Sequence, residues 1–421
     1  MRPAILASFV LGLISTAHAQ ELKWFKGNTH THSLWSDGND FPEMITDWYK
    51  QHGYDFLAIS DHNVLQAKEV WMSVPAIEKR RKSLGKTTME KYRARFGDEW
   101  VTTREKDGVT EVRLKKLEEY RPKFEEPGKF LIVQAEEISA GLGSVPIHMN
   151  AVNLKEEIKP VKDLGSIPEV MRANLRLVNE QSKRLGVPML THINHPNFRW
   201  ALSAEDLASV LEENFWEIYN GHPGINWQGD ESRPGHEKIW DIANTLRITE
   251  FKAQPLYGVG TDDSHRYHGE DNGPGRGWVM VRASKLNTDE IVKAMQAGDF
   301  YASSGVTLDD ISHFKDGTLR IRIHAEPGVT YSTQIRGTLR GYDATTRPAP
   351  AVKGDLHPAR LLYSDDVGKT LATIEGTEVT WKPSGQELYF RAVITSSKPY
   401  DKPSFEGQTE MAWTQPMGWR K

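Results

Sequence analysis

Cysteine is absent from the 421-residue sequence. A chain without cysteine cannot build a disulfide framework, and it has no thiolate to offer a metal ion. Any metal site must therefore be made of imidazole and carboxylate groups. A strong excess of one charge is also missing, since 53 basic residues face 57 acidic ones. This balance argues against nucleic acid as a stable partner, because such binding depends on a strongly positive surface.

Long apolar runs are scarce as well, and the one that stands out lies near the N-terminus. Arg2 precedes an apolar stretch at residues 5–14, and Ala17-His18-Ala19 follows it. This order is typical of a cleavable export signal, which we expect to span residues 1–19. The run is too short to cross a bilayer. We therefore expect a periplasmic or secreted protein that has no membrane partner after cleavage.

Over the first two-thirds of the chain, strand-like segments alternate with helical ones. Several strand candidates are near-continuous apolar runs, as expected of parallel strands buried on both faces. The seven candidates span residues 23–27, 56–60, 130–135, 147–152, 188–193, 215–219 and 256–260. Helix start signals fall between them at Asp40, Ser166 and Ser203, and Gly186 is a stop signal. The pattern predicts an α/β barrel over residues 20–309.

Two segments depart from this alternation. Residues 68–128 are rich in charge, with eight basic and two acidic residues between positions 78 and 95. They predict either a solvated helical insertion or a cap whose cations meet an anionic substrate. After about residue 310 apolar and polar residues alternate, as around Leu319 and Ile321. Residues 310–421 are therefore expected to form an all-β, sandwich-like module.

The most informative pattern is the placement of histidines and carboxylates at the ends of the predicted strands, where barrel enzymes carry their functional groups. His30 and His32 end the first strand, and their i, i+2 spacing presents two imidazoles to one ion. Asp263 and His265 repeat this spacing after the seventh strand. Further candidates are Asp37, Asp61, His62, Glu136, Glu137, His148, His192 and His195. Together these residues predict a centre for divalent metal ions.

Taken in order and spacing, the motifs resemble those of the polymerase and histidinol phosphatase (PHP) superfamily over about residues 24–305. The matching segments are Asn28-Thr-His30-Thr-His32, Ser36-Asp37-Gly, Ser60-Asp-His62-Asn, Glu137-Ile-Ser, His148, Asn194-His195-Pro-Asn and Asp263-Ser-His265. The resemblance implies a distorted seven-stranded (β/α)7 barrel. It also implies two or three divalent metal ions, of zinc, manganese or iron.

The same resemblance implies three sets of metal ligands. The first set is His30, His32, Glu137 and Asp263. Glu137 would also contact a second ion, together with His148 and His195. The third set is Asp37, His62 and His265. Glu136 could replace Glu137, and Asp262 could replace Asp263, but the Glu-Ile-Ser and Asp-x-His contexts favour Glu137 and Asp263.

Residues beside these ligands are candidates for other roles. Asp61 and His192 could orient a ligand or relay a proton during catalysis. The candidate cations for binding a phosphate group are Arg199, Arg266 and Arg276. The aromatic candidates for lining the mouth, or for merely covering the barrel top, are Trp35, Phe198 and Trp200.

A metal-dependent hydrolase is the function that these features predict. Divalent ions bridged by a carboxylate acidify water and offset the charge of a transferring group, so a phosphoesterase acting on a small organic phosphate is the leading hypothesis. One alternative is a hydrolase of a carboxylic ester, an amide or a lactone. A second alternative is a glycan- or polymer-binding protein that uses the C-terminal module, with Trp413 and Trp419 as its docking surface. The sequence leaves the oligomeric state open.

Overall fold

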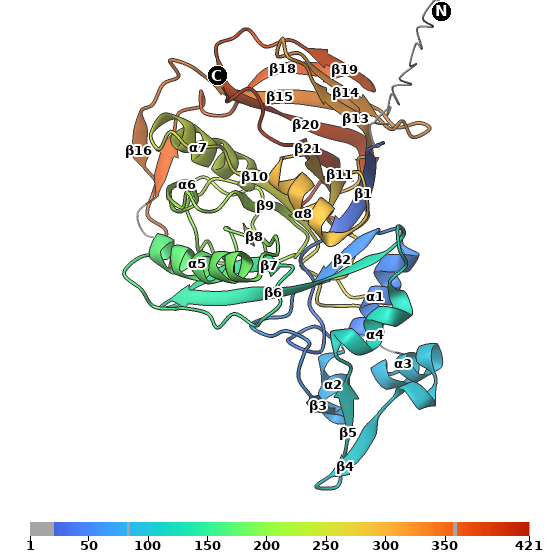
Figure 1. Cartoon of the computed structure of the whole chain (residues 1–421). Coiled ribbons are helices and arrows are strands. Elements are labelled where there is room, and N and C mark those ends of the chain that lie inside the picture. The colour runs from blue at the N-terminus through green and yellow to red at the C-terminus, as the bar shows by residue number, and fades with distance from the viewer. Residues whose placement is uncertain (1–20, 82–84, 357–359, 421) are drawn as a thin grey trace, which may run out of the picture.

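The computed structural model describes residues 21–81, 85–356 and 360–420. The predicted export signal at residues 1–19 lies outside this part of the chain. Within it, no helix is both long and apolar enough to cross a membrane. The described chain is a mixed α/β structure in which one 13-stranded sheet runs from the N-terminal part into the C-terminal part (Figure 1).

Seven strands of this sheet are neighbours in the order in which they occur along the chain. They are β1 (Lys23–Asn28), β2 (Phe56–Ile59), β6 (Leu131–Leu142), β7 (Val145–Val152), β8 (Leu190–Ile193), β9 (Phe215–Asn220) and β10 (Tyr257–Thr261). Each predicted strand segment is therefore present. Strands β2 and β9 are buried along their whole length, as their continuous apolar runs require of strands covered on both faces.

The first and the last of these strands meet just beyond their C-terminal ends. The backbone N–H of Asp263 donates to the carbonyl of His30 at 3.0 Å, and that of His32 donates to the carbonyl of Ser264 at 2.9 Å. At its other end, β1 pairs instead with the antiparallel strand β11 (Trp278–Ala283). The residues that follow β1 and β10 are thus held side by side.

The predicted alternation of strands and helices is wrong between β6 and β7. These strands form an antiparallel hairpin with Gly143 in its turn at φ +57°, and β7 and β8 are antiparallel as well. Antiparallel neighbours need only a short link, so no helix is required between β6 and β7. The hairpin register sets Ser139 opposite His148, which brings His148 within reach of Glu137.

Helices cover the outside of these strands. They are α1 (Pro42–Gln51), α5 (Ile167–Leu185), α6 (Ala204–Ser209), α7 (His236–Thr249) and α8 (Thr288–Gln296). The predicted start of α5 is confirmed, because the Ser166 hydroxyl accepts a hydrogen bond from the N–H of Glu169 at 3.4 Å. Gly186 ends this helix in the left-handed region at φ +63°. Ser203 caps α6 in the same way, 3.2 Å from the N–H of Asp206.

The charged insertion forms a lobe beside α1 (Figure 1). Its elements are β3 (Val70–Ser73), α2 (Val74–Arg80), α3 (Thr88–Phe96), η1 (Asp98–Trp100), β4 (Thr103–Lys106), β5 (Val109–Leu114) and α4 (Leu117–Phe124). The expectation of a purely helical insertion is wrong, since β3, β5 and β4 form a three-stranded antiparallel sheet. Tyr92 stacks on Phe41 at 3.8 Å between ring centroids, so the lobe packs firmly on the rest of the chain.

The C-terminal part is rich in strands, as predicted. They are β12 (Phe300–Ser303), β13 (Leu308–His313), β14 (Leu319–Ile323), β15 (Tyr331–Leu339), β16 (Thr346–Pro348), β17 (Leu361–Tyr363), β18 (Lys369–Glu375), β19 (Glu378–Trp381), β20 (Glu387–Pro399) and β21 (Thr409–Thr414). The sheet β13-β14-β19 shares an apolar core with β15 and β20, which gives a sandwich-like packing. Strand β21 pairs with β12, so the large sheet continues across position 310. The exact boundary between the two parts stays a prediction.

Side chains of the C-terminal part also pack against strands β9 and β10. The Gln415 amide accepts a hydrogen bond from the N–H of Gly258 at 2.8 Å and donates to its carbonyl at 2.9 Å, which covers the free edge of β10. Trp413 is fully buried and stacks on Tyr219 at 5.4 Å between ring centroids. The expectation that Trp413 forms an exposed docking surface is therefore wrong, because its ring belongs to the core.

A buried ion pair joins the same two parts. The Arg391 guanidinium on β20 donates to both carboxylate oxygens of Asp241 on α7 at 2.9 Å, and neither side chain is exposed. The Tyr389 hydroxyl donates to the same carboxylate at 2.8 Å. The pair is bidentate and carries a third donor, which is the arrangement that buried charges need.

We expect Arg391→Met to destabilise the protein by about 3 kcal/mol, because it removes the bidentate partner of the buried Asp241 carboxylate and leaves only Arg336, 3.5 Å away, as a cation. The measurement is the free energy of unfolding in urea. Arg322→Met is the matched control, since Arg322 pairs with Asp309 at the surface and should change stability by no more than about 1 kcal/mol. Equal losses in the two variants would contradict the importance of the buried pair.

Candidate metal centre

The mouth of the strand ring, beyond the C-terminal ends of the strands, gathers all nine residues predicted as metal ligands. Their ligand atoms form four overlapping groups, and within each group all of these atoms lie within 4.8 Å of one another. The nine are His30, His32, Asp37, His62, Glu137, His148, His195, Asp263 and His265. His30 and His265, which follow β1 and β10, converge because an isolated bridge between Thr31 and Ser264 joins the segments after these two strands.

The first ligand set lies deepest in the mouth. His30 Nε2 and His32 Nε2 are 3.1 Å apart, and each lies 3.2 Å from Asp263 Oδ1. The Glu137 carboxylate is 3.5 Å from His30 and 3.4 Å from His32. Ligand atoms held around one divalent ion at about 2.1 Å stand roughly 3.0–3.4 Å apart. The spacing of these side chains therefore fits an ion between them.

The second set shares Glu137 with the first. Glu137 Oε1 is 3.2 Å from His148 Nδ1 and 3.4 Å from His195 Nε2. Glu137 Oε2 lies 2.7 Å from His62 Nδ1, so the same carboxylate also contacts a member of the third set.

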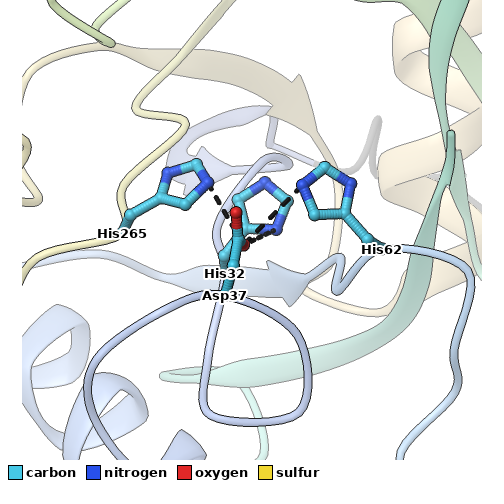
Figure 2. Close-up of side chains that lie close together, drawn as sticks. All are labelled: His32, Asp37, His62 and His265. Carbon is cyan, nitrogen blue, oxygen red and sulfur yellow. Dashed lines mark ion pairs between the residues drawn. The ribbon is translucent and has the colours of Figure 1, made fainter. Parts of the chain in front are cut away.

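The third set lies nearer the surface. Figure 2 shows its Asp37, His62 and His265 together with His32 of the first set. Asp37 Oδ1 lies 3.3 Å from His265 Nε2, 3.7 Å from His62 Nε2 and 3.8 Å from His32 Nδ1. The Asp37 side chain is 57% exposed, whereas those of Glu137 and Asp263 are 1% and 6% exposed. These distances are longer than those of the first set, so the third set is the looser one.

The buried ligands shift one another's pKa. Despite burial, the nearby carboxylates raise the pKa values of His30, His195 and His265, and that of His62 to about 11, so these imidazoles must lose a proton to bind a metal ion. Burial raises the pKa of Glu137, but the nearby imidazoles of His62 and His148 outweigh it and hold this pKa well below its ordinary value. Burial likewise raises the pKa of Asp263, and His30 and His32 reverse the shift. Burial, together with His265 and His62, lowers the pKa of His32 to about 4. Ionised carboxylates and a neutral imidazole are the forms that coordinate divalent ions.

Glu217, on β9, is a functional candidate that the sequence analysis did not assign. Its buried carboxylate lies 2.6 Å from His30 Nδ1 and accepts hydrogen bonds from the His195 backbone N–H at 2.8 Å and the Thr261 hydroxyl at 2.8 Å. It thereby fixes the ring orientation of His30, as the outer partners of metal-binding histidines do. A glutamate inside a fully buried strand was the sequence signal that could have revealed it.

The two predicted catalytic residues lie behind the ligands. The Asp61 carboxylate accepts hydrogen bonds from the Ser33 N–H at 2.8 Å, the Ser33 hydroxyl at 2.7 Å and the Ser36 hydroxyl at 2.7 Å. His192 is fully buried, 3.1 Å from the Thr29 hydroxyl, and burial lowers its pKa to about 4. Neither lines the cavity at the mouth. This placement favours an orienting role over proton transfer to a substrate.

Glu136 and Asp262, the alternatives to two ligands, face away from the mouth. Glu136 Oε2 accepts a hydrogen bond from the N–H of Ile158 at 3.0 Å. The Asp262 carboxylate accepts hydrogen bonds from Tyr49 at 2.6 Å and from the N–H of Gly277 at 2.7 Å. The structure therefore brings Glu137 and Asp263, and not their neighbours, to the other candidate ligands.

A cavity of about 310 Å³ opens onto the second and third sets. Of the three predicted arginines only Arg266 lines it. Arg199 is exposed elsewhere, and Arg276 is buried with its guanidinium 3.3 Å from the Ser404 hydroxyl. Of the three predicted aromatic residues only Phe198 lines the cavity.

His222 and Asn272 also line this cavity, and the sequence analysis missed both. The His222 ring lies 5.4 Å from that of His265, edge to face. Asn272 Nδ2 is 3.2 Å from His265 Nδ1. His222 follows β9, so it obeys the rule that revealed the other histidines, namely a histidine just after a barrel strand.

We expect Glu217→Gln to weaken binding of the tightest divalent ion by about 10- to 100-fold, because an uncharged amide holds His30 less firmly. Competition with a chromophoric chelator measures this affinity. Glu213→Gln is the control, since Glu213 is an equally buried carboxylate that bonds to the backbone before β9. Unchanged affinity in Glu217→Gln would show that Glu217 does not support the centre.

Comparison with known proteins gives matches among solved structures alone. No protein-family model matches the sequence, and no curated protein does. A solved structure from Bacteroides vulgatus, described as a two-domain protein containing a predicted PHP-like metal-dependent phosphoesterase, is 14% identical with a TM-score of 0.40; the match covers 89% of this chain and 90% of that one.

Two shorter structures also match. PsfC from Pseudomonas syringae is 12% identical with a TM-score of 0.33, and the match covers 65% of this chain and 87% of that one. A presumed metal-dependent phosphoesterase from Bifidobacterium adolescentis is 14% identical with a TM-score of 0.32, covering 64% and 95%. Similarity at this level carries no conclusion about activity.

Proposed function

We propose that this chain is a PHP superfamily member that acts as a metal-dependent phosphoesterase on a small organic phosphate. One observation carries the proposal: nine imidazole and carboxylate side chains, Glu137 among them, form four overlapping groups of possible metal ligands next to a cavity that Arg266 also lines. Fold likeness alone does not define a reaction, so the proposal rests on this site. We further propose that the seven consecutive strands form a distorted barrel, and that residues 1–19 direct export to the periplasm or beyond.

The ligand sets offer room for two or three divalent ions, such as zinc, manganese or iron. Divalent ions at such a centre acidify water and offset the negative charge of a phosphoryl group. Glu137 is placed to serve two sets at once, since its two oxygens face His148 on one side and His62 on the other at 3.2 and 2.7 Å. A shared carboxylate keeps the two sites at a fixed separation.

The cavity wall supplies the groups that would hold the substrate. Arg266 presents a guanidinium, the side chain best suited to the oxygens of a phosphate group. Phe198 offers an apolar face to the organic part of the substrate. The volume of about 310 Å³ suits a small molecule and not the body of a polymer.

A screen of phosphomonoesters and phosphodiesters with the purified chain tests the activity. We expect turnover that depends on added manganese, zinc or iron and that free phosphate or vanadate inhibits. Hydrolysis of carboxylic esters, amides or lactones without any phosphate ester turnover would overturn the phosphoesterase proposal while leaving a metal hydrolase in place. An absence of metal binding would overturn both.

We expect Arg266→Met to lower kcat/KM for the phosphate ester by about 10- to 100-fold, because a charge-assisted hydrogen bond contributes roughly 1.5–3 kcal/mol. Steady-state kinetics at saturating metal measures the change. Arg199→Met is the matched control and should keep the activity of the unaltered protein, since Arg199 is exposed outside the cavity. A loss of activity in Arg199→Met alone would reassign the substrate contact.

A further inference from the structure

The insertion at residues 68–128 makes a specific contact with the loop that carries Asp37. Arg80, the last residue of α2, donates from one guanidinium nitrogen to the carbonyl of Ser36 at 2.7 Å and to the carbonyl of Gly38 at 2.9 Å. These carbonyls lie immediately before and after Asp37. A single side chain thus fixes the backbone on both sides of a candidate metal ligand.

The backbone around Asp37 is also held by hydrogen bonds from the Ser36 N–H to the Ser33 carbonyl at 3.1 Å and from the Asn39 N–H to the His265 carbonyl at 2.9 Å, but the Asp37 side chain itself has few partners. Its side chain is 57% exposed, and the Ser36 hydroxyl 3.4 Å away is its neighbour outside the imidazoles. Gly38 is packed so closely that a Cβ there would lie 2.4 Å from the His32 carbonyl, so the turn has a single tight shape. The Ser36 and Gly38 carbonyls of this turn need a hydrogen-bond donor, and the Arg80 guanidinium supplies it.

The insertion also contacts the loop that carries His265. The Arg266 guanidinium donates to the carbonyl of Arg80 at 2.7 Å. Farther along this loop, the His268 ring lies 2.9 Å from Lys91 Nζ and 3.3 Å from the Thr88 hydroxyl, both on α3. The same insertion therefore braces both loops whose side chains meet in the third ligand set.

The other ligand sets do not share this dependence. His30 and His32 directly follow β1, Glu137 lies on β6 and His148 on β7, and Asp263 directly follows β10. These positions are set by hydrogen bonds within the strand ring, such as that from the Asp263 N–H to the His30 carbonyl. The first two sets thus depend on the consecutive strands, whereas the third combines His62, which follows β2, with the two loops that the insertion braces.

We propose that the insertion controls metal occupancy of the third ligand set, and that Arg80 is the positioning residue through which it does so. The proposal rests on the metal centre proposed above. It gives the insertion a role other than a cap whose cations touch the substrate, because the Arg80 guanidinium is engaged with backbone carbonyls. The first two ligand sets would then bind their ions without help from the insertion. The third set would bind its ion only when Arg80 donates its hydrogen bonds to the turn that carries Asp37.

The test compares Arg80→Met with the unaltered full-length protein. Methionine keeps the length of the side chain and removes both hydrogen bonds, while the backbone carbonyl that Arg266 uses remains. Equilibrium dialysis against manganese or zinc, followed by elemental analysis, counts ions per chain and gives the affinity of each class. We expect the weakest class of ion to bind about 10- to 100-fold less tightly in Arg80→Met, with the other classes unchanged.

Arg104→Met is the matched control, because Arg104 is exposed on β4 of the same insertion and pairs with Glu111. It should bind metal like the unaltered protein. Thermal unfolding verifies that each variant is folded, and if Arg80→Met does not fold, Lys91→Met tests the second brace by the same ion count. Three unchanged classes in a folded Arg80→Met would overturn the inference and leave the metal centre standing. An unaltered protein that binds no ion would instead overturn the proposed function.

Discussion

The burial of Glu137 and Asp263 among imidazole nitrogens is the constraint on which the mouth of this molecule depends. Carboxylates removed from water are stable only when cations or hydrogen-bond donors surround them. Asn194 donates to Glu137 at 2.8 Å, and Asn220 donates to Asp263 at 3.1 Å. Glu137 Oε2 also lies 2.7 Å from His62 Nδ1 and 3.4 Å from His32 Nε2. Carboxylate oxygens that face several imidazole nitrogens form a donor set that divalent metal ions bind.

The same constraint explains strain in the backbone of the mouth. His195 and Asp263 lie in the left-handed region at φ +26° and +47°, which non-glycine residues rarely occupy. Such conformations persist where surrounding contacts enforce them. Glu217 accepts from the N–H of His195, and the His30 carbonyl accepts from the N–H of Asp263. The hydrogen bonds that hold the strained residues therefore come from elements that also orient ligands.

The order of the strands and the positions of the candidate ligands could be predicted from sequence because both follow local rules. A buried strand needs a continuous apolar run, and a histidine at its end needs no knowledge of the rest of the chain. Missed features depended on partners far away in sequence. The Arg266 guanidinium donates to the carbonyl of Arg80, and the Arg276 guanidinium donates to the Ser404 hydroxyl. These distant partners decide which of the two arginines faces the cavity. No local pattern contains that information.

The β6–β7 hairpin shows a different limit. Gly143 and its neighbours are consistent with a short turn, but the apolar runs on either side fit parallel and antiparallel strands equally well. Only the pairing across the sheet decides the direction of β7. Because the hairpin sets His148 opposite Ser139, the direction of this strand also decides how one ligand reaches Glu137.

The C-terminal part contacts two strands and one loop that position the candidate metal ligands. Gln415 covers the edge of β10, the strand that leads into Asp263, and Trp413 packs beneath Tyr219 on β9. Lys402 donates to the carbonyl of Pro274, in the loop that follows His265, at 3.2 Å. Lys91 and Thr88 on α3 of the insertion contact His268 in the same loop. The loop carrying His265 thus contacts both the insertion and the C-terminal part, so its geometry depends on segments outside the seven consecutive strands.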